Sequence, residues 1–178
     1  MHELIDRELY NAIEYAKNID EATGRSIIKQ FQSDQPALSQ TIFTLFPTMI
    51  SAKNQDMAHL FMDLCFDIIC IYQHVFGDIP AQNEEWLKKQ AALMEAELQA
   101  LIPKNKINAK IRSKDQDRFS QSSKNEVTQP GLVKFMNNSI DSYAAEIPGS
   151  TAAIKITQTM TFTVIRMFNN LYSQGANK

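Results

Sequence analysis

The segment that decides the fold is MAHLFMDLCFDIICIYQHVFG, residues 57–77, the most apolar stretch of the chain. At a rise of about 1.5 Å per residue it is long enough to cross a domain as a helix. On a helical wheel it is apolar over about two thirds of its circumference, which is typical of a helix with neighbours on several sides. We therefore predict that it is the central helix of the protein.

One face of this predicted helix is polar. His59, Asp63, Asp67, Cys70 and His74 fall within an arc of about 80° when successive residues are placed about 100° apart. Such a strip is available to water, a ligand or a partner. Two aspartates near the middle of a membrane span would each cost about 3 kcal/mol, so we do not expect this helix to cross a membrane.

The composition predicts helices throughout. Only five glycines and six prolines occur among the 178 residues, too few for the turns of an all-β chain. Apolar residues at helical spacing predict further helices near 3–17, 20–33, 36–50, 84–102, 130–147 and 151–173. Asp20 and Asn54 are the expected N-caps of two of them. Pro47 lacks a backbone donor and should kink or split its helix near Phe43.

Length, charge and cysteine usage limit the class of protein. A chain of this length fits one domain with an adequate core, so residues 1–178 are predicted to form a single helical domain. The net charge of -2 argues against a generally basic nucleic-acid binder. Cys65 and Cys70 lie about 140° apart on the central helix and should not pair. Free cysteines and an N-terminus without an apolar leader predict a cytoplasmic protein.

Residues 104–129 differ from the rest of the chain. Seven lysines and arginines stand against three acidic residues there, and apolar residues are sparse. We interpret the segment as a basic loop or linker. It could contact nucleic acid weakly, but Phe119 is its one aromatic residue, so a solvated linker is the favoured interpretation.

Two short motifs suggest an internal duplication. QPAL (35–38) and QPGL (129–132) each stand at the head of a predicted helical hairpin, and the second helices align at a shift of 96 residues. The alternative is that any two amphipathic helices align at some shift. If the hairpins are related by a pseudo-two-fold axis, the central and C-terminal helices should pack together through positions that include Phe66, Ile69, Phe162 and Ile165.

The same alignment predicts a partner-binding surface. It places the acidic strip of the central helix near a basic strip of the C-terminal helix, where ion pairs would hold the two together or a dipolar cleft would take a ligand. The residues concerned are Asp63, Asp67, His74, Lys155 and Arg166.

A metal site is the most specific chemical candidate. His59, Asp63 and Asp67 recur every fourth residue, so neighbouring pairs could share an ion. His74 lies about 22 Å from His59 along the axis and could not join them. Bundle metal sites draw ligands from more than one helix, and no second Glu-x-x-His element exists here. A solvated or salt-bridged strip is the favoured alternative.

No nucleophile motif, phosphate-binding loop or dinucleotide fingerprint occurs, and no cofactor is predicted. The sequence thus predicts an all-α, single-domain bundle of about six or seven helices, with two pseudo-repeated hairpins as its finer organisation. The preferred function is a non-enzymatic protein-interaction or regulatory module, whose partner is another protein or a second copy of the chain. The alternatives are a metal-dependent enzyme with its site on the central helix and a weak nucleic-acid binder that uses the basic segment.

Overall fold

The computed structural model describes residues 1–80, 82, 85–86, 90 and 129–174. Within these ranges the regular structure is helical and contains no strand, so the all-α prediction is confirmed. The chain divides into two units, Met1–Gln82 with Gln129–Lys178, and Asn83–Thr128. The predicted helix near 84–102 and the basic segment lie outside the described residues, apart from positions 85–86 and 90, which are helical, and Gln129.

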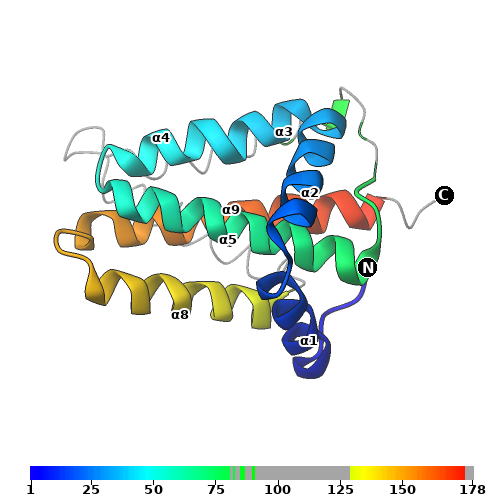
Figure 1. The fold of residues 1–178 in the computed structure, drawn as a ribbon, viewed down its shortest axis with the longest axis horizontal. Helices are drawn as coiled ribbons and strands as arrows, with labels where there is room; N and C mark the ends of the chain where they lie inside the picture. The colour runs from blue at the N-terminus through cyan, green and yellow to red at the C-terminus, as the bar shows by residue number, and fades with distance from the viewer. Residues whose placement is uncertain (81, 83–84, 87–89, 91–128, 175–178) are drawn as a thin grey trace, which may run out of the picture. The chain divides into compact units, whose positions relative to one another are not determined.

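The first unit holds the elements that position the candidate site (Figure 1). They are α1 (Asp6–Lys17), α2 (Glu21–Asp34), α3 (Pro36–Gln40), the π-helical turn η1 (Thr41–Leu45), α4 (Phe46–Ser51), α5 (Gln55–Phe76), α8 (Pro130–Glu146) and α9 (Thr151–Gln174). The predicted caps are confirmed: Asp20 accepts a hydrogen bond from the amide of Thr23, and Asn54 accepts one from the amide of Met57.

α5 is the central helix of this unit and contacts α1, α4, α8 and α9. Its fully buried side chains include Phe61, Ile68, Ile69, Ile71 and Tyr72, and each such apolar side chain stabilises the fold by about 1.5–3 kcal/mol. In the described part of the chain, α5 alone is long and apolar enough to cross a membrane by composition, but half of that stretch is buried by its neighbours. The core of a bundle accounts for its apolar character.

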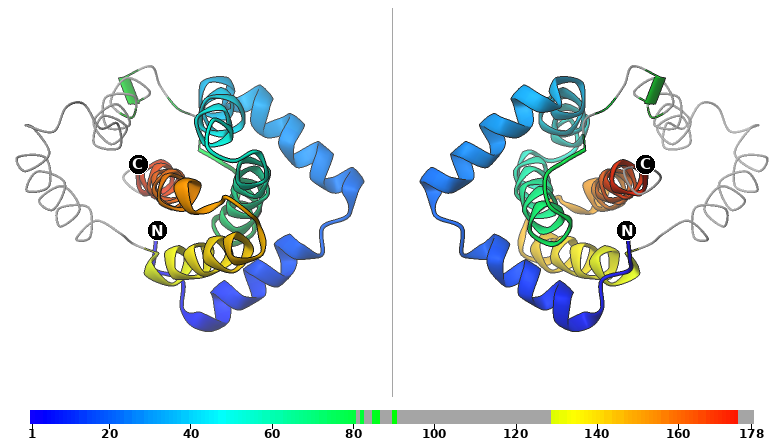
Figure 2. Two further views of the ribbon diagram at one scale, coloured as in Figure 1. Left: turned by 90° about the vertical axis from the view of Figure 1, so that its left-hand side faces the viewer. Right: turned by 90° about the vertical axis from the view of Figure 1, so that its right-hand side faces the viewer.

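Two helical hairpins meet at α5 and α9. α3, η1 and α4 lead into α5, and α8 leads into α9; in Figure 2, seen along the helices, α5 and α9 lie side by side with α4 and α8 outside them. The rings of Tyr72 and Phe168 are 5.2 Å apart, and those of Phe76 and Tyr172 are 5.7 Å apart. The predicted packing of the central helix against the C-terminal helix is therefore present.

Two residues of that predicted contact, Ile69 and Ile165, are buried. The ring of Phe66 lies near α2: a methyl group added to Gly24 would lie 3.3 Å from Cζ of Phe66. Phe66 therefore has a neighbour in α2 that the sequence did not predict, and Gly24 allows the close approach. The predicted contacts of Phe66 and Phe162 between α5 and α9 stay a prediction.

The predicted interruption at Pro47 takes the form of a π-helical turn. The amide of Phe46 donates to the carbonyl of Thr41, five residues earlier, in place of the usual four. Pro47 has no amide to donate to Phe43, so the wider turn surrounds the position where an α-helical bond is missing. Leu38, Ile42, Phe46 and Ile50 are all buried along this segment.

Candidate functional site

The polar strip of α5 is partly covered by α1. Asp67 and Cys70 are buried, whereas His59, Asp63 and His74 are exposed. α1 approaches closely because its buried positions include two small residues, Ala12 and Ala16. The strip was predicted to face water or another molecule. Its C-terminal half is instead partly covered by α1 of the same chain.

An ion pair joins the two helices at this point. Nζ of Lys17 lies 2.5 Å from Oδ2 of Asp67. The carboxylate side chain is 9% exposed and the lysine side chain is 55% exposed. Burial raises the pKa of Asp67 above its ordinary value; the hydrogen bond and charge of Lys17 oppose this, and the charge of Asp63 adds to it. Lys17 thus compensates a carboxylate that would be costly to bury alone.

A second contact between the helices is aromatic. The rings of Tyr15 and His74 stack with centroids 4.1 Å apart and an angle of 18° between their planes. Tyr15 remains 40% exposed. The stack fixes the orientation of a tyrosine that would otherwise extend freely from the surface of α1.

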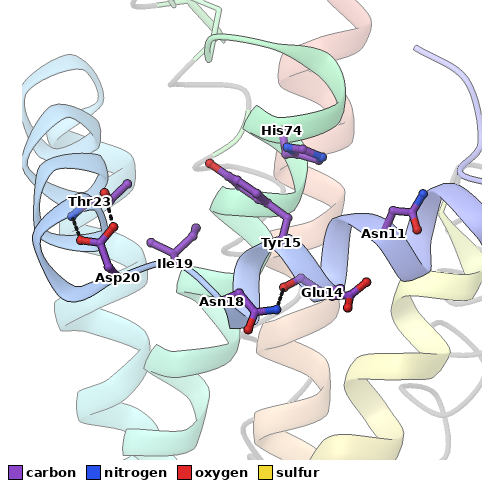
Figure 3. Close-up of a pocket in the computed structure, with 8 residues that line it drawn as sticks. All are labelled: Asn11, Glu14, Tyr15, Asn18, Ile19, Asp20, Thr23 and His74. Carbon is purple, nitrogen blue, oxygen red and sulfur yellow. Dashed lines mark hydrogen bonds between the residues drawn. The ribbon is translucent and has the colours of Figure 1, made fainter.

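Tyr15 and His74 line a pocket at the turn between α1 and α2, shown in Figure 3. Its volume is about 490 Å³, and it opens to solvent. Four segments contribute to its lining, which includes Glu14 and Tyr15 of α1, Ile19 and Asp20 of the turn, Thr23 of α2 and His74 of α5. The sequence pattern placed His74 on the polar strip and Asp20 at a helix N-cap, but it identified none of the other six lining residues. The available signal was an exposed aromatic residue, Tyr15, outside the apolar face of the first helix.

The pocket lining carries negative charge. Asp20 accepts bonds from both the amide and the hydroxyl of Thr23, at 2.9 and 2.7 Å. These bonds lower the pKa of Asp20 below its ordinary value, so the carboxylate stays ionised. Glu14 supplies a second carboxylate, and neither lysine nor arginine is among the lining residues. The lining is therefore acidic on balance.

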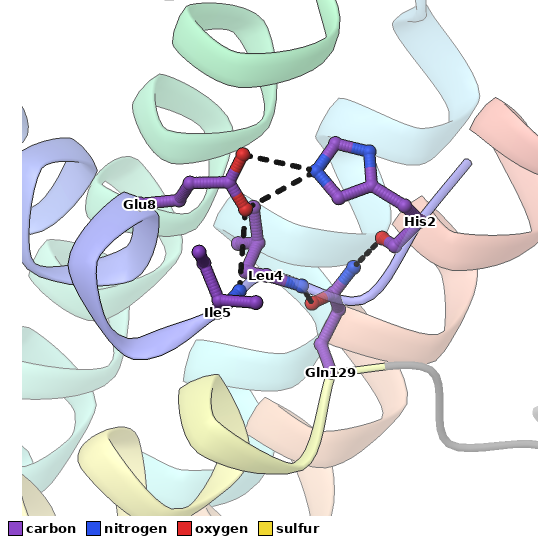
Figure 4. A network of polar contacts seen from close by, with 5 residues as sticks. All are labelled: His2, Leu4, Ile5, Glu8 and Gln129. Carbon is purple, nitrogen blue, oxygen red and sulfur yellow. Dashed lines mark hydrogen bonds and ion pairs between the residues drawn. The ribbon is translucent and has the colours of Figure 1, made fainter.

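A separate polar network fixes the N-terminal segment ahead of α1 (Figure 4). The amide of Leu4 donates to Oε1 of Gln129 at 2.8 Å, and Nε2 of Gln129 donates to the carbonyl of His2 at 2.9 Å. His2 also pairs with Glu8 at 3.3 Å. Gln129 is 1% exposed. This buried glutamine joins the segment before α1 to the start of α8.

The predicted metal ligands are not brought together. Asp67 is bound to Lys17, and His59 lies 3.0 Å from Nε2 of Gln55. No group of three histidine, cysteine, aspartate or glutamate side chains in the described ranges could hold an ion. The metal hypothesis stays a prediction without a preformed site among these residues.

The remaining predicted site residues lie apart from the pocket. Asp67 pairs with Lys17, so of the two predicted arrangements the ion pair between the acidic and basic strips is not formed at this carboxylate, and the cleft between them stays a prediction. The cause is the packing of α1 on α5, which brings a nearer cation. Lys155 is exposed, and Arg166 is half-buried.

The two cysteines do not supply a nucleophile. Both are free and buried. Burial, with the charge of Asp67, raises the pKa of the Cys70 thiol to about 12 and raises that of Cys65 well above its ordinary value. Thiols that remain protonated at neutral pH are weak nucleophiles.

Comparison of the chain with protein-family models, with curated proteins and with solved structures finds no match.

Proposed function

We propose that this chain is a non-enzymatic, cytoplasmic helical module that binds another protein. The observation that carries the proposal is the open pocket at the α1–α2 turn, whose lining includes a tyrosine stacked on His74 and the carboxylates of Glu14 and Asp20. Tyrosine is enriched at protein interfaces because it offers a large contact area with few rotatable bonds. Tyr10, on the same helix, is 66% exposed but does not line the pocket.

The chemistry of the described residues supports binding rather than catalysis. Asp20 is held ionised and oriented by Thr23, so it is poorly suited to carry protons at neutral pH. The thiols are buried and protonated. What the pocket offers is charge, an aromatic ring and open access, which are the features of a recognition site.

We also propose that the module arose from two copies of one hairpin. Gln35 and Gln129 have nearly the same backbone angles, φ -133° and ψ 57° against φ -133° and ψ 61°. Both are buried, each precedes a helix-starting proline, and the side-chain amide of each donates to a backbone carbonyl, of Pro80 and His2 respectively. The two residues of each aromatic pair, Tyr72–Phe168 and Phe76–Tyr172, are 96 positions apart, which is the shift of the sequence alignment.

Site-specific photo-crosslinking tests the binding proposal. A photo-reactive amino acid at Asn11, on the pocket, is compared with one at Ser142, an exposed position of α8. We expect one discrete crosslinked protein from position 11 and none from position 142. The captured protein, once purified, should bind the wild-type chain and lose at least fivefold in affinity for Tyr15→Ala but not for Tyr10→Ala, its matched control outside the pocket. Equal crosslinking from both positions, or none, contradicts the proposal.

A further inference from the structure

Residues 2–17 form an N-terminal arm, which consists of the segment before α1 and α1 itself. Polar side chains of the rest of the first unit hold it at three separate points: Gln129, His74 and Asp67. An apolar contact adds to these, since a methyl group added to Gly131 of α8 would lie 3.1 Å from Cδ2 of Leu9. The arm is thus received by a specific surface on α5 and α8.

The interface between the arm and α5 is more polar than the interface between α5 and α9. The buried residues of α1 are one leucine and two alanines, and α1 meets α5 through an ion pair and an aromatic stack. α9 meets the same helix through large rings such as the pair Tyr72–Phe168. Polar interfaces between parts of one chain usually allow relative motion. The arm can therefore separate from α5 while the core between α5 and α9 stays intact.

The linker to α2 does not fasten the arm. Residues 18–20 connect the two helices. Asn18 bonds back to the carbonyl of Glu14, and Asp20 bonds forward to the amide of Thr23, so each bond stays on its own side of the linker. The open pocket of Figure 3 has lining residues from both helices, and Figure 2 shows the helices diverging from the turn. A change of direction at the linker therefore leaves α1 and α2 themselves intact.

We propose that two copies of the chain exchange this arm, so that the arm of each copy docks on α5 and α8 of the other. Every contact that holds the arm within one chain is available between two chains, because the residues are the same. Only the linker changes its conformation, which makes such an exchange a low-cost route to a dimer. The linker and the chain concentration then set the balance between single and paired chains. This inference goes beyond the proposed function and does not depend on the pocket.

The chemistry of the surface favours the arm of a second copy over a helix of another protein. Asp67 is almost fully enclosed and requires a cation at one position. Gln129 accepts a bond from one backbone amide and donates to one carbonyl, so it requires an extended segment beside it. His74 requires a ring at a third point. A second copy supplies all three groups together.

Reversal of the charges in the ion pair tests the exchange with full chains. Lys17→Glu and Asp67→Lys each place like charges together within one chain, but an exchanged pair of the two variants restores opposite charges at both arms. We expect each variant alone to be monomeric, and a mixture refolded together from urea to give a dimer of twice the mass by light scattering. The matched control replaces Lys17→Glu with Lys29→Glu, which has the same net charge and an exposed position outside the arm. A mixture that stays monomeric, or a control that forms as much dimer, would overturn the proposal.

Linker length provides a second measurement, because a lysine at the buried position 67 can prevent folding. Deletion of Ile19 from the otherwise wild-type chain strains the turn within one chain and should favour the exchanged dimer. Insertion of Gly-Ser-Gly after Asn18 is the control and should leave the chain monomeric. In a dimer of isotope-labelled and unlabelled chains, isotope-filtered nuclear magnetic resonance should detect the Tyr15 ring of one copy against the His74 ring of the other. A deletion variant that stays monomeric, or a dimer in which this contact remains within one copy, would contradict the exchange.

A peptide separates a second copy from other occupants of the surface. The probe is an acetylated peptide of residues 2–18, added to the full chain that carries Lys17→Glu. Binding of this peptide together with dimers of the mixed variants supports the exchange. Binding of the peptide while the mixed variants stay monomeric would show that the surface accepts a separate helix, as from another protein, and would refute exchange between copies.

Discussion

Lys17 of α1 and Asp67 of α5 form an ion pair of unequal burial, with the carboxylate almost fully enclosed and the ammonium more than half exposed. The two residues are 50 positions apart in the chain, so the pair forms only when α1 packs against α5. Removal of the lysine leaves a buried charge, whereas removal of the aspartate leaves a cation that water can solvate. The two substitutions should therefore have unequal effects.

Lys17→Met should lower the free energy of unfolding by about 1–3 kcal/mol at pH 7, because Asp67 is left buried without its partner. Urea unfolding measures the loss. The matched control is Lys29→Met, an exposed lysine of α2, which should change stability by less than about 0.5 kcal/mol. Equal losses for the two variants would show that the pair contributes nothing.

The loss caused by Lys17→Met should also depend on pH. Burial already raises the pKa of Asp67 in the folded state, and removal of Lys17 removes a group that lowers it. The folded variant then holds the proton more firmly than the unfolded chain does, so its relative stability is greatest in acid and falls as pH rises through the raised pKa. Unfolding curves at pH 4 and pH 7 should show the smaller loss at pH 4.

Gln129→Leu should loosen the N-terminal segment. The substitution removes the acceptor of the Leu4 amide and the donor to the His2 carbonyl, with an expected cost of about 1–3 kcal/mol. Hydrogen exchange should accelerate at Leu4 and along α1 before it changes in α9. Gln30→Leu is the control, since Gln30 is exposed and bonds only to Asp34. Under the duplication proposal, Gln35→Leu should lower stability to a similar degree.

Gly77→Ala should destabilise the end of α5 by about 1–3 kcal/mol. Gly77 has φ 83° and ψ -160°, a backbone conformation that is essentially restricted to glycine. No atom lies within 4 Å of an added methyl group, so the cost is conformational rather than steric. Gly24→Ala, in the helical interior of α2, should lose less stability. The higher helix propensity of alanine, about 1 kcal/mol, offsets the cost of its close contact with Phe66. Thermal unfolding compares the two, and a larger loss at Gly24 would contradict the prediction.

The buried tyrosines should limit stability in alkali. The hydroxyl of Tyr72 donates to Asn169 at 2.6 Å, and that of Tyr172 donates to the carbonyl of Gly77 at 2.8 Å. Burial raises the pKa of both phenols above the ordinary value of 10.0. Because the unfolded chain releases these protons first, stability should fall as pH rises above about 10. Tyr72→Phe should be less stable at pH 7 but lose less between pH 10 and 12. An unchanged alkaline slope would contradict this.

The metal hypothesis has a direct test. We expect no stoichiometric zinc, manganese or iron in the purified chain and no rise in melting temperature when these ions are added, because binding to the native state must raise stability. Elemental analysis and thermal unfolding measure both. The expectation would be contradicted by one equivalent of bound metal that the His59→Ala variant loses and the His2→Ala variant retains.

Local features of the fold were predictable from the sequence, and long-range pairings were not. Asp20, Asn54 and Pro36 begin helices through hydrogen bonds or backbone angles set within one turn, so their roles follow from the neighbouring residues. The strip on α5 was visible from periodicity alone. Its partners, Lys17 and Tyr15, depend on how α1 docks, which no local pattern encodes. The pocket was missed for the same reason, since its lining comes from three helices and a turn.

The π-helical turn at Thr41–Leu45 makes the length of this segment as important as its composition. Residues spaced by four drift by about 40° per step around an α-helix, yet Leu38, Ile42, Phe46 and Ile50 are all buried. The wider turn absorbs this drift. A one-residue deletion before the turn would leave the turn in place and rotate everything after the deletion by about 100° relative to what precedes it. A one-residue deletion within the turn would instead leave an ordinary helix with Phe46 and Ile50 on nearly the same face. Over evolution this stretch should therefore accept substitutions throughout, but the loss of a residue only within the turn.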